Sequence, residues 1–363
     1  MTQGVVLCLS PRCTIRVQLA SSIAHSSSAE PAAGPGAEPT RLRLSECSDL
    51  TETLPMVLSK LSGDEAGIVF GRLCNVLDPR IAIYFSSTTQ GLWVLTQTLR
   101  LQLKTDHEAA AALCLKVGLR SCKELREAKK ACWRNKGLSV ADLARLGTLG
   151  SMLPELESLC IYEKLANPDG MQQLVAGLGS GALLAVTELV FYSITMGDAG
   201  ASGLATALGR GALPRLNSLE LINAGIGDAG LLALAPALRR RPALEKLTLI
   251  ANSLGDEGLA ALVAPPPPPV DAGYPLSPPP TGVLTKLTRL NLGLTQVTDA
   301  GCARLASALG SGALPALEVL HLWDIPASAA GQAIVREARP HVMFFFRLRA
   351  GTSLTLTLNT PPL

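Results

Sequence analysis

One pattern of apolar and polar positions returns several times in the second half of the chain. It begins with leucines spaced L-x-x-L-x-L, as at Leu216, Leu219 and Leu221, and then passes through the phrase Gly227 to Gly230. Apolar residues spaced three and four apart follow that phrase. The end of the leucine motif alternates with period 2, which predicts a short strand, whereas the later spacing has the period of a helix. Each copy therefore predicts one strand followed by one helix.

A glycine closes the polar phrase in each copy and sets the period. These glycines are Gly170, Gly200, Gly230, Gly258 and Gly301, and successive ones are 30, 30, 28 and 43 residues apart. The longest interval contains residues 265–280, which we interpret as a proline-rich insertion with an extended PPII conformation. Such a run is either a ligand for an SH3- or WW-type domain or a loop without a partner, and we favour the loop.

An aspartate stands at the predicted start of most of the repeated helices. A carboxylate there can accept from free backbone N–H groups and interacts favourably with the positive end of the helix dipole. We therefore expect these aspartates to cap their own helices: Asp198, Asp228, Asp256 and Asp299.

A strand and a helix repeated at this length resemble the leucine-rich repeats of the ribonuclease-inhibitor class. The resemblance implies an α/β fold, a solenoid of about six β-α units over residues 151–335, preceded by a small all-helical domain. A single unit buries too little apolar surface to fold alone, so stability is expected to belong to the stack.

Strand residues that alternate away from the core leucines are predicted to face the concave side of such a solenoid. Tyrosine and tryptophan anchor many protein interfaces, so this side predicts a groove for a protein client. The alternative is that these side chains pack on one another and bind nothing. The partner-binding candidates are Tyr162, Tyr192, Ile222, Ile250, Trp323, Glu220, Asn291 and His321.

Residues 45–104 carry a different apolar pattern. An apolar pair precedes Leu73, the phrase Leu77 to Pro79 follows, and two serines precede Leu92 and Trp93. This arrangement resembles an F-box, the short helical motif that docks on the adaptor subunit of cullin-type ubiquitin ligases. It departs from that motif at its start, where Ser62 follows the leucine in place of proline. The resemblance implies adaptor contacts by Leu61, Val69, Phe70, Leu73, Leu77, Pro79 and Leu92. The alternative is a helical cap for the open end of the solenoid.

The remaining segments are predicted from composition and spacing. Residues 1–44 are rich in serine, alanine and proline and are interpreted as a disordered tail and linker. Residues 105–150 are predicted to form linker helices or an N-terminal cap, with a helix starting at Asp106 and a solvated basic face around a packed Trp133. Residues 336–363 form a C-terminal tail in which the alternating runs from Met343 and from Ser353 can pair with the last strand.

Composition changes this picture little. A net charge of +3 gives no argument for a nucleic-acid partner, and no long apolar run predicts a membrane span. The nine cysteines contain no C-x-x-C motif and the four histidines lack metal-ligand spacing, so we expect no metal site and no cofactor. No phosphate-binding loop or nucleophile elbow occurs, so we expect no catalytic residues and no enzyme. The cysteines favour a reducing compartment, which predicts a cytoplasmic protein, with the nucleus as the alternative.

These observations predict a protein–protein interaction module. The first hypothesis is a substrate receptor of a cullin-type ubiquitin ligase that binds its client on the concave repeat face. The alternative is a non-catalytic binding scaffold whose N-terminal helices only cap the solenoid. A third, less favoured hypothesis follows from the resemblance alone, because related repeats occur in activators of Ran-type GTPases, and it would make Arg289 a supplied catalytic side chain.

Overall fold

A computed structural model describes residues 4–9, 15–20, 58–164, 168–263 and 284–346. The chain divides into two compact units, Met1–Leu54 and Pro55–Leu363. In the first unit, β1 (Gly4–Leu9) and β2 (Ile15–Ala20) form an antiparallel pair. These strands fall within residues 1–44, which the sequence analysis assigned to a disordered tail. Apolar and polar residues alternate in β2, which is a strand pattern. The serine-, alanine- and proline-rich composition of residues 1–44 favoured disorder instead.

The second unit is built on a single eight-stranded sheet in which every neighbouring pair is parallel. The strands lie side by side in chain order, so each connection moves one strand along the sheet. The strands are β3 (Lys130–Arg134), β4 (Ser158–Tyr162), β5 (Glu188–Tyr192), β6 (Ser218–Ile222), β7 (Lys246–Thr248), β8 (Arg289–Asn291), β9 (Val319–His321) and β10 (Met343–Phe345).

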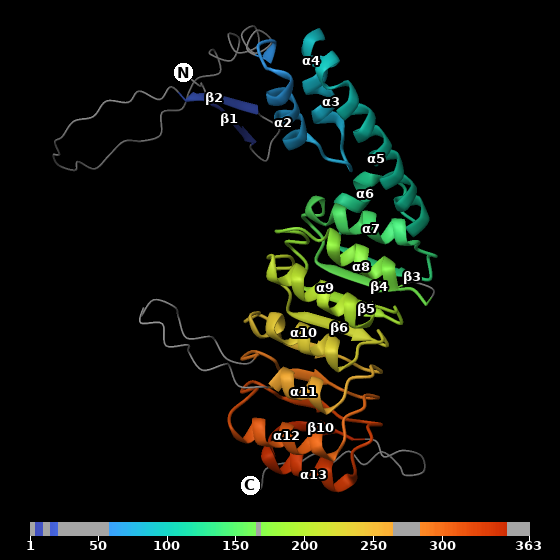
Figure 1. Ribbon diagram of the computed structural model, residues 1–363, viewed down its shortest axis with the longest axis vertical. Helices are drawn as coiled ribbons and strands as arrows, with labels where there is room; N and C mark the ends of the chain where they lie inside the picture. The colour runs from blue at the N-terminus through green and yellow to red at the C-terminus, as the bar shows by residue number, and fades with distance from the viewer. Residues whose placement is uncertain (1–3, 10–14, 21–57, 165–167, 264–283, 347–363) are drawn as a thin grey trace, which may run out of the picture. The chain divides into compact units, whose positions relative to one another are not determined.

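A helix follows each strand from β3 to β9, and successive helices pack against one another on one side of the sheet (Figure 1). This order of strand, helix and single step along the sheet is a solenoid-like α/β fold, so the predicted fold class is confirmed at that level. The helices are α7 (Val140–Leu149), α8 (Pro168–Gly177), α9 (Gly197–Gly209), α10 (Asp228–Arg239), α11 (Asp256–Val263), α12 (Asp299–Gly310) and α13 (Ala329–Ala338), and a short 3₁₀ turn, η2 (Gly150–Met152), follows α7.

The sheet begins one unit earlier than the sequence pattern predicted. Segment 130–134, placed among helices by the sequence analysis, is strand β3, so the predicted helical surface around Trp133 is wrong. Ala131 and Trp133 point into the core, while the three residues that alternate with them are exposed. Lysine and arginine are frequent in this segment, and the alternation of buried and exposed positions extends over only five residues, so the strand pattern was not recognised.

At the other end, β10 pairs with β9, as predicted for the run from Met343. The second predicted run, from Ser353, lies outside the described residues, as does the proline-rich insertion.

Alternate strand residues build the core. The parallel register stacks one apolar side chain from each strand in a column, and a second column runs two residues further along. These side chains are almost fully buried: Leu159, Leu189, Leu219, Leu247, Leu290 and Leu320 in the first column, and Ile161, Phe191 and Leu221 in the second. A buried side chain of this size stabilises the fold by about 2 kcal/mol, and in this geometry the neighbouring unit completes the burial.

The repeated aspartates cap the next helix and not their own, so that detail of the prediction is wrong. Asp228 is the first residue of α10, one position past the N-cap, and its Oδ1 accepts from the backbone N–H groups of Gly255 (2.7 Å) and Gly258 (2.8 Å) in the following unit. The same link recurs from Asp198 to Gly227, from Asp256 to Thr298 and from Asp299 to Ser328.

This link also accounts for the repeated glycine in the later units, from Gly230 onward. A Cβ atom at these glycines would lie 2.2 to 2.6 Å from Oδ1 of the preceding unit's aspartate, closer than any side chain tolerates. The glycines concerned are Gly230, Gly258, Gly301 and Gly331. The aspartate and the glycine are thus one device for bringing successive helices into contact.

The N-terminal helices of the second unit are α2 (Gly63–Leu73), α3 (Arg80–Ser87), α4 (Gln90–Leu95), α5 (Gln97–Val117) and α6 (Cys122–Arg126). Helix α5 runs through residue 104, where the sequence analysis placed a boundary, and the helix start predicted at Asp106 is wrong. Leu103 belongs to a small core with α2, α3 and α4, whereas Leu113 belongs to the main core. One continuous helix therefore serves both cores.

Candidate binding surface on the open face of the sheet

The face of the sheet opposite helices α7 to α13 is called the open face here. The register aligns its residues in three rows that cross the strands. The first row starts at Lys130 and the second at Cys132, and the third starts at Arg134 and ends on the loop residue Trp323. All eight candidate partner-binding residues lie in the second and third rows, so the strand alternation predicted their placement.

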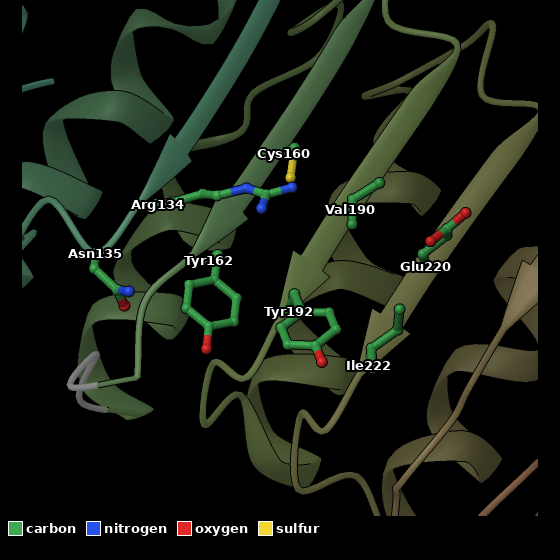
Figure 2. A pocket seen from close by; sticks show the side chains of 8 residues that line it. All are labelled: Arg134, Asn135, Cys160, Tyr162, Val190, Tyr192, Glu220 and Ile222. Carbon is green, nitrogen blue, oxygen red and sulfur yellow. The ribbon is translucent and has the colours of Figure 1, made fainter. Parts of the chain in front are cut away.

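A hollow of about 640 Å³ opens on this face over β3 to β6 (Figure 2). Four of the predicted residues line it, namely Tyr162, Tyr192, Ile222 and Glu220. Cys160 and Val190 complete its floor, and Arg134 and Asn135 contribute from the end of β3. Sequence reasoning missed these last two because it did not recognise β3, and the alternation of Ala131 and Trp133 was the signal that could have found them.

Two tyrosines form the centre of the hollow. The rings of Tyr162 and Tyr192 are 4.9 Å apart between centroids with an interplanar angle of 34°. Tyr192 is 40% exposed although it stands on a sheet strand. An exposed tyrosine held against a second ring offers a large rigid contact area at a low entropic cost, which is what an interface anchor requires.

Charges of opposite sign stand at the two sides of the hollow. Figure 2 shows the Arg134 guanidinium reaching over β4 toward Cys160, while Glu220 lies across the hollow on β6. Burial and the nearby Glu188 raise the pKa of the Glu220 carboxyl, and Lys246 on β7 opposes the shift. Within the described residues neither Arg134 nor Glu220 forms a salt bridge. Both charges are therefore available to a partner.

The thiol of Cys160 is not poised for nucleophilic chemistry. Burial and the adjacent Cys132 raise its pKa to about 12, so it is protonated at neutral pH. In the part of the chain that the structure describes, no group of three histidine, cysteine or acidic residues is placed to hold a metal ion. What the hollow offers is a shaped, aromatic and charged surface.

At the other end of the open face, three half-buried candidates contact other groups of the chain. Trp323 lies directly over Gly293, where a Cβ atom would come within 2.4 Å of the indole ring. His321 stacks on Phe345 with centroids 4.4 Å apart, and burial, together with Arg289, lowers its pKa. Asn291 Oδ1 accepts from the backbone N–H of Gly293 at 3.1 Å. These candidates already have partners within the chain.

Two further candidates from the sequence lie outside the hollow. Ile250 is half-buried and follows β7, one strand beyond Ile222. Arg289, named in the GTPase-activator hypothesis, is exposed at the first open-face position of β8, beside Lys246 on β7. The structure does not bring either residue together with the tyrosine pair.

The residues proposed for adaptor binding are mostly internal. Phe70, 1% exposed, packs with Leu73 and Leu92 in the small helical core, and Leu77 belongs to the main core. The others, Leu61, Val69 and Pro79, are half-buried. Ser62, where the sequence departs from the F-box pattern, caps α2 in a reciprocal pair with Glu65. Serine at this position therefore serves as the N-cap of helix α2.

A second hollow, of about 520 Å³, lies on the surface of the same helices. Its apolar lining comes from the exposed Ile83, Trp93, Val94 and Leu101, together with the half-buried Pro79 and the buried Leu103. The Arg100 guanidinium carbon lies 3.2 Å from the centroid of the Trp93 ring and holds that side chain in place. Of the residues predicted to contact an adaptor, Pro79 lines this hollow, and Trp93, which belongs to the F-box-like pattern, lines it as well. Ile83, Val94 and Leu101 were not among the predicted adaptor contacts.

Comparison of the chain with protein-family models and with curated proteins returns no match. Across the described residues, no helix combines the length and the apolar character needed to cross a bilayer.

Proposed function

We propose that this chain is a leucine-rich repeat protein of the ribonuclease-inhibitor class that binds another protein on the open face of its sheet. The observation that carries the proposal is the hollow over β3 to β6, with the exposed Tyr192 packed on Tyr162 at its centre. The charges at its sides form no salt bridge within the described residues. Interfaces concentrate their binding energy on such aromatic anchors.

The leucine-rich assignment is supported by the turn after β7. There the buried Asn252 accepts from the N–H groups of Ala224 and Ile226, both at 3.1 Å, and donates to the carbonyl of Leu221 at 2.7 Å. One asparagine thereby satisfies backbone groups of the preceding unit, the task expected of the asparagine in this repeat. At the equivalent turn after β8, Thr295 makes a single bond to Leu292 in its own unit.

A photo-crosslinking experiment tests the open face as the binding surface. The full chain would carry benzoylphenylalanine in place of Tyr192 or, as a matched control, in place of Leu232, an exposed apolar residue on α10. The proposal predicts a protein adduct from position 192 in lysate of the source cells, with loss of that adduct in the Tyr162→Ala background. Equal labelling from both positions would contradict it.

A second candidate function concerns the N-terminal helices, and the exposed apolar hollow on α3 to α5 favours it. We infer that these helices dock an adaptor subunit of a cullin-type ligase, which would make the protein a substrate receptor. A side chain such as Val94 gains little from exposure to water, and a partner that covers it recovers the apolar burial.

The test is binding of the full chain to a purified F-box adaptor subunit, with Val94→Asp as the disrupting variant. Leu115→Asp is the matched control, because Leu115 and Val94 are exposed to 67% and 65%. Phe70→Ala is a poor choice, since its side chain is interior and its loss would unfold the helices. Loss of binding in Val94→Asp alone supports the receptor, whereas absence of binding by the folded wild type leaves these helices as a cap.

A further inference from the structure

The open face carries its charges in bands that follow the strand order. Lys130 and Arg134 stand on β3, the acidic pair Glu188 and Glu220 follows on β5 and β6, and Lys246 continues on β7. The register places each of these residues on the side away from the helices. A ligand that crosses the strands over the hollow therefore meets a positive side first and a negative side last, with aromatic surface between.

The carboxylates of Glu188 and Glu220 form no salt bridge within the described residues. Glu188 accepts from the Ser158 hydroxyl at 2.8 Å, which fixes its carboxylate beside the hollow. Glu220 is half-buried near the Glu188 carboxylate. Lys246 does not come within salt-bridge distance of Glu220. A cation supplied from outside would offset both the repulsion between the two carboxylates and the energetic cost of the partial desolvation of Glu220.

We infer that the hollow recognises an extended protein segment with an acidic side chain opposite Arg134, an apolar side chain over the tyrosine pair, and a basic side chain opposite Glu220. This inference rests on the proposed function and specifies the chemistry of its partner. The stem of a lysine or arginine approaching Glu220 would lie along the ring of Tyr192, so packing would add to the charge contact.

The spacing of the strands sets the spacing of the ligand. Neighbouring strands are about 4.8 Å apart, so the charged sides of the hollow are separated by roughly 10 to 14 Å. In an extended segment every second side chain faces the same way, at intervals of about 6.8 Å. Three such side chains span the hollow, which gives the order acid–x–apolar–x–base. A segment with the reverse order fits equally well by crossing in the opposite direction.

The experiment is a selection of random nine-residue displayed peptides on the full chain, run in parallel on charge variants. The wild type is expected to enrich peptides with one acid and one base four positions apart and an apolar residue between. Glu220→Lys leaves two positive sides and should enrich acid–x–apolar–x–acid, whereas Arg134→Glu should enrich base–x–apolar–x–base. Each variant is expected to bind its own class about tenfold more tightly than the wild-type class.

Two controls connect the selected peptides to the hollow. Tyr192→Ala should lose the peptides of every class, because the anchor is common to them. A bound peptide should also slow alkylation of the exposed Cys132 without changing the buried Cys302, as located by mass spectrometry.

The outcomes separate the two proposals. Peptides that depend on Tyr192 but show the same charge pattern on all three proteins would overturn the charge order while the open face remained the binding surface. If no peptide binds the folded wild type in a Tyr192-dependent way, the inference is also overturned. The proposed function is then tested separately, by cross-linking from position 192.

Discussion

The two ends of the open face use similar residues in opposite ways. Over β3 to β6, Tyr162 and Tyr192 leave ring surface exposed above a hollow. Over β8 to β10, Trp323 covers a glycine of the preceding unit and His321 is stacked on Phe345. An aromatic side chain on a sheet face is an anchor for a partner only where its own neighbours leave it uncovered. Among the described aromatic residues of the open face, Tyr192 is the exposed one, and it lies at the β3 to β6 end.

The largest expected effect is at the turn that joins the two halves. Asn252→Ala would leave two N–H groups and one carbonyl of the β6 unit without partners, so the free energy of unfolding should fall by about 4 kcal/mol. Thr295→Ala, at the equivalent turn of the next unit, removes one bond and should cost about 1 kcal/mol. Chemical denaturation measures both, and equal losses would contradict the cross-unit role of Asn252.

At the β8 to β10 end of the face, the expected effect is on stability. Trp323→Ala removes the indole that covers Gly293 and should lower the free energy of unfolding by about 3 kcal/mol. Affinity for a partner of the hollow should stay the same, because Trp323 has its contacts within the chain. Denaturation and a binding assay on the same preparation check this, and a variant that loses affinity but not stability would reverse the assignment.

At the uncovered end, the expected effect is on binding. Tyr192→Ala should weaken partner binding by about 2 kcal/mol, roughly thirtyfold, with a smaller change in stability because the ring is already exposed. Titration calorimetry with the cross-linked partner or a selected peptide provides the affinity. Unchanged affinity in a folded variant would remove the tyrosine pair from the interface.

The smallest expected effect is a pH dependence from Glu220, whose neighbours on the adjacent strands include Glu188 and Lys246. Its raised pKa means that the folded protein binds the proton more tightly than the unfolded chain. The stability contributed by protonated Glu220 is therefore present below its ordinary pKa and is lost as the pH rises toward the folded value. Affinity for a basic group should change in the opposite sense and increase over that range.

Glu220→Gln should abolish this part of both pH profiles, which unfolding and binding titrations between pH 4 and 7 would follow. Profiles identical to those of the wild type would show that another group is responsible.

The sequence predicts much of this architecture because the repeated units carry two distinct apolar periods over many residues. It does not predict β3, where lysine and arginine occupy the exposed alternate positions and leave only Ala131 and Trp133 as signal. That omission also removed Arg134 from the candidate site. The contact of Trp323 with Gly293 could not be predicted either. The two residues belong to different units, and only the register of β8 and β9 brings them together.

The aspartates and the F-box candidates show a similar limit. Asp228 stands at a helix start in the sequence, but being one residue past the N-cap directs its carboxylate to the neighbouring unit. Phe70 and Val94 are both apolar residues of short helices, and only the packing of those helices makes one interior and the other exposed. Local pattern predicts elements well, whereas exposure depends on contacts between distant segments.

The most direct test of the central claim compares cross-linking from the two halves of the open face. Benzoylphenylalanine would replace Tyr192 on β5 or Arg289 on β8, both exposed on the same face of the sheet. We expect an adduct with the same partner protein in high yield from position 192 and little from position 289. Equal yields, or a higher yield from position 289, would contradict the assignment of binding to the hollow over β3 to β6.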